Sequence, residues 1–392
     1  MKIYNIRSYR DGEKTGMSAD IELRASTKKY TLFFEQTVEN ALAVDGTAFL
    51  AAMIPVGMFL KESIEVEGVV STHFYKNIPA ILETVTGWNK GFSPVKIEVS
   101  TLKKDTIKAK YTGCFFSGGA DSYYTYLKNK KKITNLIFVH GFDIKIGDKD
   151  LYTKIENNIA TIADSENVSL TRIKTNIREI YEEYFDWDLV HGFAVGSVAL
   201  ALRNQFSAIY VSCGLPTKHM DHHSMTPELD PLWSGDAMNI IHYGCSADKL
   251  AKLTFLSRFP IVMKTLRVCW VNTKNSYNCC RCEKCLRNML GLYCADALHK
   301  CQTFNKSVDL NVLENTKVSL YVLKYFKAIL NVLEEKNDKS PIRKSLEVFI
   351  VKNEHPTGRE KVIATIRMYA RHIDKQYNHN RLYWFLARQG IV

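Results

Sequence analysis

The residues with the clearest capacity for chemistry form one short loop, Ser117-Gly118-Gly119-Ala120-Asp121-Ser122. It follows an apolar run at 111–116 and precedes residues 123–129, whose spacing predicts a helix. Paired glycines let backbone N–H groups approach an anion closely, and the amino end of a helix adds aligned donors and partial positive charge. The hydroxyls of Ser117 and Ser122 can donate to phosphate oxygens. The loop therefore predicts a phosphate-binding turn.

Two familiar phosphate-binding patterns do not describe this loop. The Walker P-loop needs a longer glycine spacing followed by Lys-Ser or Lys-Thr. The dinucleotide fingerprint needs three spaced glycines, which are absent here. An ordinary strand-to-helix turn is the plain alternative, but the whole six-residue string in this context favours a nucleotide.

A second group of reactive side chains lies further along the chain. Of ten cysteines, five fall within 17 residues: Cys269, Cys279, Cys280, Cys282 and Cys285. The Cys-x2-Cys-x2-Cys run brings three thiolates together, and Cys269 can supply the fourth. Four thiolates suit a closed, structural zinc site, with an iron–sulfur cluster as the rival. Cys280 is the spare thiol, because including it would break the spacing.

The loop resembles the PP-loop of the N-type ATP pyrophosphatases, whose pattern is Ser-Gly-Gly-x-Asp-Ser. Those enzymes bind ATP with Mg²⁺, cleave between the α and β phosphates and form an adenylated intermediate. The resemblance implies that Asp121 helps to place the magnesium and that Ser117, Asp121 and Ser122 are catalytic. It implies that the pyrophosphate is cradled by Ser117, Gly118, Gly119, Asp121 and Ser122.

Together with the cysteine run, the loop resembles the 7-cyano-7-deazaguanine synthase family over residues 109–295. In that family a lone cysteine and a Cys-x2-Cys-x2-Cys run bind structural zinc. The implied zinc ligands are Cys269, Cys279, Cys282 and Cys285. The family usually has glycine after the first cysteine of the run, where this chain has Cys280.

The resemblance implies a C–N bond-forming ligase. Such an enzyme adenylates a carboxylate-bearing substrate, such as a 7-deazapurine, for attack by ammonia or an amine. Since this chain is larger than the synthase, the amine can also belong to a protein, and enlarged relatives occur in anti-phage operons. Two alternatives stay open. One is a PP-loop tRNA-modifying sulfurtransferase with Cys213 and Cys280 as reactive thiols. The other is an assembly module that holds nucleotide and zinc without turnover.

The elements that must position these residues alternate between strand and helix in the middle of the chain. This alternation predicts an α/β fold with a doubly wound parallel sheet, and the resemblance implies the adenine nucleotide alpha hydrolase-like (HUP) type. We predict an N-terminal α+β cap at 1–105, the catalytic domain at 106–295 and a basic helical region at 296–392. The predicted strands are 111–116, 136–140, 168–173, 208–213 and 239–242.

Ligands of such sheets bind at the carboxyl ends of the strands. His140 and Gly141 close the second predicted strand and Gly214 follows the fourth, so all three are expected to face the nucleotide. Residues 214–238 form a long polar loop, which is often functional. Its candidate substrate contacts are Lys218, Asp230 and Trp233. Beyond it, three cations can neutralise phosphate charge: Lys249, Lys252 and Arg267.

Composition limits the setting. The 392 residues carry a net charge of +12, which allows a nucleic-acid partner without favouring one. The longest apolar stretch, 48–60, is short of the roughly 20 residues of a membrane span. The amino terminus becomes charged within ten residues and predicts no secretory signal, so a cytoplasmic location is expected. A homodimer stays open.

Overall fold

The computed structural model describes residues 1–24, 28–37, 42–107, 109–214, 224–272 and 276–355. The described strands are β1 (Lys2–Asp11), β2 (Lys14–Glu22), β3 (Lys29–Gln36), β4 (Ile64–Ser71), β5 (Ile97–Lys103), β6 (Tyr111–Phe115), β7 (Asn135–His140), β8 (Ser169–Thr175), β9 (Phe206–Ser212) and β10 (Asn239–Tyr243). The described α-helices are α1 (Thr47–Leu60), α2 (Thr72–Trp88), α3 (Ala120–Lys128), α4 (Lys149–Glu166), α5 (Ile177–Tyr181), α6 (Trp187–Ala201), α7 (Lys249–Leu256), α8 (Pro260–Thr265), α9 (Glu283–Cys294), α10 (Leu310–Asn315), α11 (Leu320–Glu335) and α12 (Pro341–Glu354). Two 3₁₀-helices are η2 (Asp230–Trp233) and η4 (Leu298–Lys300).

All the described strands join one mostly parallel sheet in the order β10-β9-β6-β7-β8-β3-β2-β1-β4-β5. The five strands from β6 to β10 are parallel to one another. From β6 the chain moves outward through β7 and β8, then returns to the other side of β6 for β9 and β10. The fold is thus α/β and consistent with the predicted doubly wound sheet. Its strand order reverses between β6 and β9.

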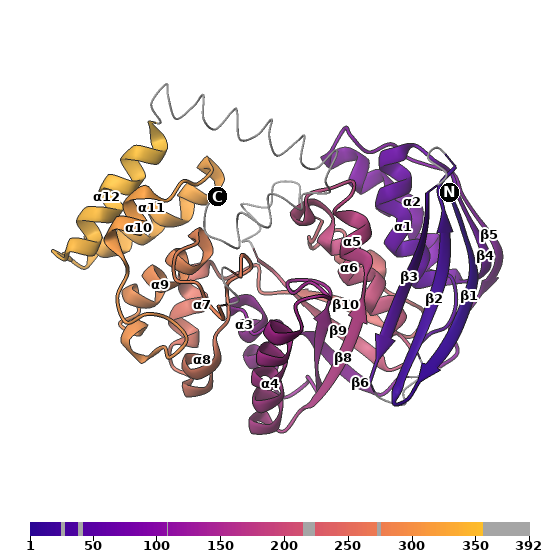
Figure 1. Cartoon of the computed structure of the whole chain (residues 1–392), viewed down its shortest axis with the longest axis horizontal. Coiled ribbons are helices and arrows are strands. Elements are labelled where there is room, and N and C mark those ends of the chain that lie inside the picture. Colours follow the sequence, from indigo (N-terminus) through magenta and orange to yellow (C-terminus); the bar gives the residue numbers. More distant parts are fainter. Residues whose placement is uncertain (25–27, 38–41, 108, 215–223, 273–275, 356–392) are drawn as a thin grey trace. The chain divides into compact units, whose positions relative to one another are not determined.

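The first hundred residues extend this sheet. β3 pairs antiparallel with β8, with Phe34 opposite Thr175 and Gln36 opposite Ile173. β2, β1, β4 and β5 follow outward (Figure 1). An exposed strand edge presents unpaired N–H and C=O groups, and β3 satisfies those of β8. The predicted region 1–105 therefore contributes β1 to β5 to the same sheet as β6 to β10.

By contacts the chain divides into two compact units, whose residue ranges differ from the three predicted regions. The first unit comprises residues 1–117, 125–149 and 159–245, and the second comprises 118–124, 150–158 and 246–392. The predicted C-terminal region is helical in its described part, 296–355. No helix in the described parts of the chain is long and apolar enough to cross a membrane.

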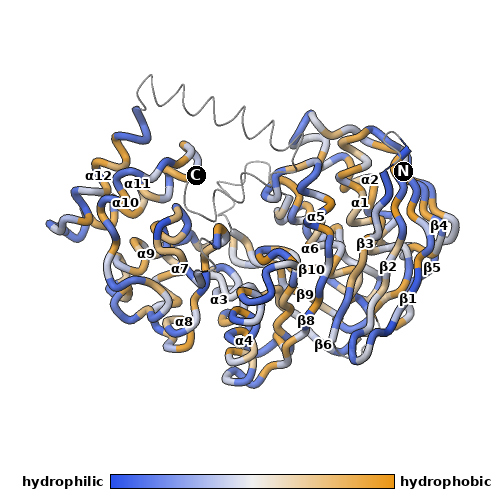
Figure 2. Tube along the Cα trace, viewed as in Figure 1, coloured by the Kyte–Doolittle hydropathy of each residue, from blue (hydrophilic) through white to orange (hydrophobic). Residues whose placement is uncertain are grey.

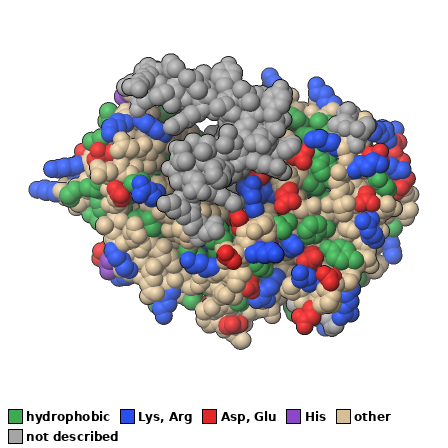
Figure 3. Space-filling view, in the orientation of Figure 1, with side chains coloured by type: hydrophobic (Ala, Val, Ile, Leu, Met, Phe, Trp, Pro, Cys, Tyr) green, Lys and Arg blue, Asp and Glu red, His purple; other side chains and the backbone are tan. Residues whose placement is uncertain are grey.

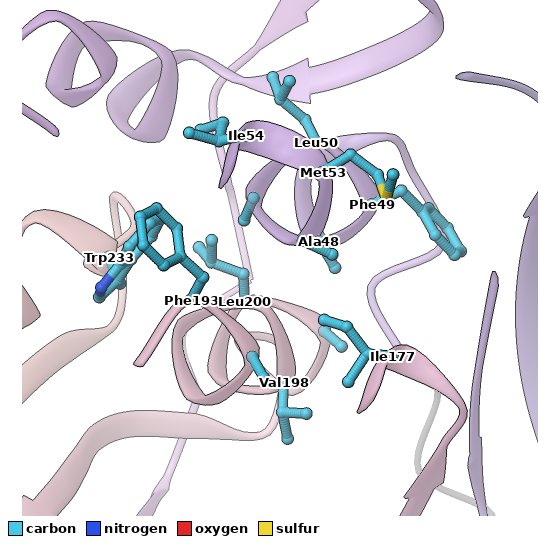
Figure 4. Packing of buried hydrophobic residues seen from close by; sticks show 14 of the residues in the cluster. Ala48, Phe49, Leu50, Met53, Ile54, Ile177, Phe193, Val198, Leu200 and Trp233 are labelled. Atoms are coloured by element: carbon cyan, nitrogen blue, oxygen red, sulfur yellow. The ribbon is translucent and has the colours of Figure 1, made fainter. Parts of the chain in front are cut away.

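The first unit has one contiguous apolar core. α1 is buried from Thr47 to Met58 on all sides, and the tube of α1 and α6 is largely orange in Figure 2. Figure 4 shows α1 beside α6, with Ala48 of α1 and Leu200 of α6 on the facing sides of the two helices. A helix that is apolar all round belongs inside a protein, which explains this placement.

The second unit is helical in its described part. Four of its helices begin at a residue whose side-chain oxygen accepts a backbone N–H three positions later, as good N-caps do. These capping residues are Asp248, Asp309, Ser319 and Ser340. Phe326 of α11 and Phe349 of α12 pack with their ring centroids 4.6 Å apart. Local capping and aromatic packing therefore define this unit's helices.

Candidate functional site

The loop after β6 has the conformation that its glycines predict. Gly118 has a φ of +75°, a left-handed conformation that favours glycine. α3 starts at Ala120, and the Ser122 hydroxyl donates to the carbonyl oxygen of Gly119 at 2.9 Å. The Gly118 carbonyl accepts the backbone N–H of Arg267 at 2.9 Å. The loop is thus held from within the second unit by its own turn and by the chain at Arg267.

Asp121, on the first turn of α3, faces two lysines of α7. Lys249 Nζ lies 2.5 Å from one carboxylate oxygen of Asp121, and Lys252 Nζ lies 3.0 Å from the other. The two lysines are three positions apart and so share a face of α7. Burial lowers the pKa of Lys249 to about 8, although Asp121 opposes that shift. Burial alone would raise the pKa of Asp121, but the two lysines hold it well below its usual range.

Arg267 adds a third cation to this group. Its side chain is 3% exposed, and its Cβ lies 3.7 Å from where a Cβ on Gly118 would stand. One terminal nitrogen donates to Asn272 at 2.8 Å. Its Nε is buried without a hydrogen-bond partner, and no carboxylate of the described residues pairs with it. Three cations, two of them buried, therefore lie beside the glycine turn, and Asp121 pairs with the two lysines.

This arrangement fits a polyanion better than it fits a bare metal ion. Each oxygen of Asp121 already accepts from a lysine, which leaves the carboxylate poorly placed as a Mg²⁺ ligand. The excess positive charge, the buried Nε of Arg267 and the amino end of α3 all favour a bound phosphate. The predicted Mg²⁺ role of Asp121 is thus not the role that these contacts favour.

The four predicted zinc ligands come together in the second unit. The Sγ atoms of Cys269 and Cys282 are 4.0 Å apart, and those of Cys279 and Cys285 are 3.8 Å apart. All four sulfurs lie within 4.8 Å of one another. Sulfurs bound tetrahedrally to zinc are separated by about 3.8 Å, given Zn–S bonds near 2.3 Å. These four cysteines can therefore hold a metal such as zinc.

Backbone donors and one asparagine shape this cluster. Cys282 caps α9, and its sulfur accepts the backbone N–H of Cys285 at 3.5 Å. The buried amide of Asn278 accepts from the N–H groups of Val268 and Cys269 and donates to Leu266. It therefore ties the segment of Cys269 to the cysteine run. Its position directly before Cys279 is the signal of this role in the sequence.

Cys280 has a conformation that glycine adopts more easily. Its φ is +57°, in the left-handed region. Its own sulfur is turned to the carbonyl of Asn278 and accepts the N–H of Asn305 at 3.4 Å. It is therefore separate from the four-sulfur group, as its spacing predicted, and occupies the position where the resembled family has glycine.

The residues predicted to face the nucleotide from the strand ends lie in different surroundings. His140 is the last residue of β7 and is 8% exposed, and burial lowers its pKa. Gly141 has a φ of +109°, and a Cβ there would lie 2.0 Å from the Thr175 carbonyl oxygen. A close turn thus requires this glycine, whatever else it contacts. Gly214 is exposed, and a Cβ there would meet nothing within 4 Å.

The three residues predicted to contact the substrate differ in their placement. Lys218 lies outside the described residues. Trp233 is 1% exposed and packs between Phe74 and Phe193, with centroids at 6.0 and 5.4 Å, so it belongs to the core (Figure 4). Asp230 is 2% exposed, and its carboxylate contacts His242 Nδ1 at 2.6 Å. Its visible role is to hold that imidazole.

A second group of metal-ligand type, missed by the sequence analysis, surrounds that histidine. The ligand atoms of Cys213, His242 and Cys245 lie within 4.8 Å of one another. The sequence predicted Cys213 only as a reactive thiol of the sulfurtransferase alternative and gave Cys245 no role. The signal was the His-x2-Cys spacing at the end of one strand, with a cysteine directly after the neighbouring strand.

The visible surface has no single sign of charge. In Figure 3, Lys and Arg side chains are interspersed with Asp and Glu. Exposed pairs such as Lys96–Glu98 and Arg24–Glu65 show the same mixing. This face offers little support for a nucleic-acid interface.

Compared with models of protein families, with curated proteins and with solved structures, the chain has no match.

Proposed function

We propose that this chain is an ATP-dependent adenylating enzyme of the PP-loop type, which cleaves ATP to AMP and pyrophosphate. One observation carries the proposal. Arg267 and Lys252 are buried beside the glycine turn, and the Lys249 side chain is 11% exposed. Asp121 pairs with the two lysines, and no described carboxylate pairs with Arg267. Buried charge without a partner is costly, and the phosphates of ATP would supply the missing negative charge.

The same cations suit the chemistry. When the bond between the α and β phosphates breaks, negative charge grows on the leaving pyrophosphate. Fixed donors in a water-poor site stabilise such charge most effectively, because they need no reorganisation. Asp121 would act as a positioning residue that holds the two lysines in place. Mg²⁺ would accompany ATP as part of the substrate, and no step is assigned to it.

The sheet and the cysteines support the family that we infer. The order β8-β7-β6-β9-β10 has its reversal beside β6, whose carboxyl end leads into the loop, as expected for a nucleotide-binding HUP-type sheet. The four-sulfur group would hold structural zinc, which stabilises the fold without entering the reaction. We therefore infer a relative of the 7-cyano-7-deazaguanine synthases. It would activate a carboxylate-bearing substrate of the 7-deazapurine class for attack by ammonia or an amine.

The sulfurtransferase alternative requires reactive thiols at Cys213 and Cys280. Both thiols are buried, whereas reactive cysteines are partly exposed in electropositive surroundings. The adenylating ligase is therefore the better candidate.

The decisive experiment measures pyrophosphate release and ATP binding separately. The purified protein is incubated with ATP, Mg²⁺, 7-carboxy-7-deazaguanine and ammonium, and the products are identified by mass spectrometry. We expect AMP, pyrophosphate and an adenylated or amidated deazapurine.

Two variants test the cation cluster in the same assay. Arg267→Gln and Lys252→Met are expected to weaken ATP binding at least tenfold, whereas Lys264→Met, an exposed lysine of the same unit, should leave it unchanged. ATP binding that is unchanged in both variants would contradict the proposal that this cation cluster binds the phosphates of ATP. ATP binding without pyrophosphate release, with every acceptor supplied, would instead favour the assembly module.

A further inference from the structure

We propose that Cys213, His242 and Cys245 form a second metal site. It would take a thiophilic divalent cation such as Zn²⁺ and leave one coordination position open. The site lies wholly within the first unit and is separate from the four-sulfur group. The proposal stands independently of the ATP chemistry.

Strand pairing brings two of the ligands together. β9 and β10 are parallel neighbours, with His242 opposite Val211 and Tyr243 opposite Ser212. The pairing continues one residue further, because the Cys213 N–H donates to the Tyr243 carbonyl at 2.8 Å. Cys213 therefore lies where β9 ends, next to the carboxyl end of β10.

A glycine brings in the third ligand. Gly244 has a φ of +100°, in the range that side chains rarely adopt. The chain turns there, and Cys245, three residues after His242, comes back beside the imidazole. The three ligand atoms then lie within 4.8 Å of one another, and a shared zinc ion would hold them roughly 3.7 Å apart.

The histidine is prepared for a metal by its other neighbour. Its Nδ1 contacts the Asp230 carboxylate at 2.6 Å. That contact favours the tautomer with the proton on Nδ1, which leaves the lone pair of Nε2 for a metal. The side chain is 3% exposed, and the thiol of Cys213 is its other polar neighbour. A thiol is a weak hydrogen-bond partner for a buried nitrogen, and a metal ion shared by the two groups would bind both more strongly. A carboxylate behind a ligating histidine is the usual outer partner of zinc.

The ligand set and position favour an open site. Two thiolates and one imidazole suit zinc, and three protein ligands leave a fourth position for water or another electron-pair donor. Cys245 is partly exposed, so solvent reaches one side of the group. The site lies at the carboxyl ends of β9 and β10, and β9 is the strand beside β6 where the order reverses. Ligands of open α/β sheets bind at that place.

The test is a metal count on the full-length protein. It is purified under reducing conditions, equilibrated with a Zn²⁺ buffer of defined free concentration and analysed by mass spectrometry. We expect two zinc ions per chain. The Cys213→Ser/Cys245→Ser variant should hold one, and Cys114→Ala, which removes another buried thiol of the same unit, should hold two. One zinc in the wild type, lost only with Cys279 and Cys282, would overturn the proposal.

Two further measurements separate ligation from a structural role. Asp230→Asn keeps the shape of the side chain and should weaken zinc binding at this site by about 10- to 100-fold in a competition titration. Co²⁺ at the second site should give thiolate charge-transfer absorption that disappears in His242→Ala. A wild-type mass 2 Da low, from a Cys213–Cys245 disulfide that persists under reducing conditions, would also overturn the metal site.

Discussion

The two compact units bury different kinds of side chain. The first unit has a contiguous apolar cluster that runs from Met1, directly before β1, to Ile240 in β10. The second unit also has apolar contacts, but it buries Lys252, Arg267 and Asn278 as well and holds four clustered thiols, two of them buried. Apolar burial stabilises without a partner, whereas buried charges and thiolates depend on what they bind. We therefore expect the apolar core around α1 and α6 to depend little on metal or anions, and the segment around the four-sulfur group to depend on them.

The largest expected difference follows removal of the four-sulfur site. In a Cys279→Ser/Cys282→Ser variant, the segment around the cluster should lose a free energy of the order of 10 kcal/mol of metal-linked stability. Hydrogen exchange should show loss of protection in peptides from 266–294, while peptides from 48–60 and 187–201 keep theirs. Cys294→Ser, outside the cluster, is the control. Equal loss of protection in both units would break the comparison.

A cavity in the apolar core should lower the free energy of unfolding independently of zinc. Phe49 is fully buried in α1, with its ring centroid 5.4 Å from that of Phe34. Phe49→Ala should lower the free energy of unfolding by about 3–5 kcal/mol, to the same extent with and without zinc. Phe59→Ala, at a 42% exposed position of the same helix, should cost less. Chemical denaturation followed by fluorescence measures both. A strong zinc dependence for Phe49→Ala would be inconsistent with a metal-independent core.

Breaking the buried ion pair of the second unit should have an intermediate effect. The Lys252 side chain is 2% exposed and that of Asp121 is 25% exposed. Lys252→Met therefore leaves the Asp121 carboxylate paired with Lys249 alone and in partial contact with water. We expect a loss of about 2–3 kcal/mol, below the figure for a wholly buried pair. Adding Asp121→Asn should recover part of it in a double-mutant cycle. Strict additivity of the two changes would show that the pair is not coupled.

The pH dependence of ATP binding tests the same cluster. Burial lowers the pKa of Lys249 to about 8, and a bound phosphate favours its charged form. Binding therefore takes up a proton above that pH, and affinity should fall by about tenfold from pH 7 to pH 9. Lys249→Arg, which stays charged, should flatten the profile in titration calorimetry. An unchanged slope in that variant would mean that another group titrates.

The smallest expected effect is at Cys280. Its left-handed backbone should favour glycine, so Cys280→Gly should raise the free energy of unfolding by less than about 1 kcal/mol without changing zinc content. The gain is small because glycine also loosens the unfolded chain. Cys280→Ala keeps the Cβ and should give no gain. Thermal melts with metal analysis distinguish the two, and loss of zinc in Cys280→Gly would give this thiol a ligand role instead.

Local signals predicted much of the candidate site. The glycine turn before α3 and the four-cysteine spacing lie within short stretches, where residue types directly constrain backbone and ligand geometry. The parallel strands from β6 to β10 were also visible, because each is a short apolar run between helices. The predicted carboxyl ends of β6 and β9 differ from the observed carboxyl ends by a single residue.

Contacts between distant residues were less accessible. Nothing in the sequence near β3 says that it pairs with β8, since an edge strand accepts any partner with a free row of N–H and C=O groups. Trp233 was taken for a substrate contact because it lies in a polar loop, yet it packs in the apolar core. The pairing of Asp121 with two lysines about 130 positions away was not predicted from spacing.

The sequence by itself determined the turn, the cysteine ligand set and the alternation of strand and helix, because those depend on neighbours within a few residues. Only the tertiary structure decided which strands share the sheet, which cations surround Asp121, and that Asp230 holds His242 beside Cys213 and Cys245. These contacts arise when packing brings distant segments together, and the free energy of that packing is a property of the whole chain.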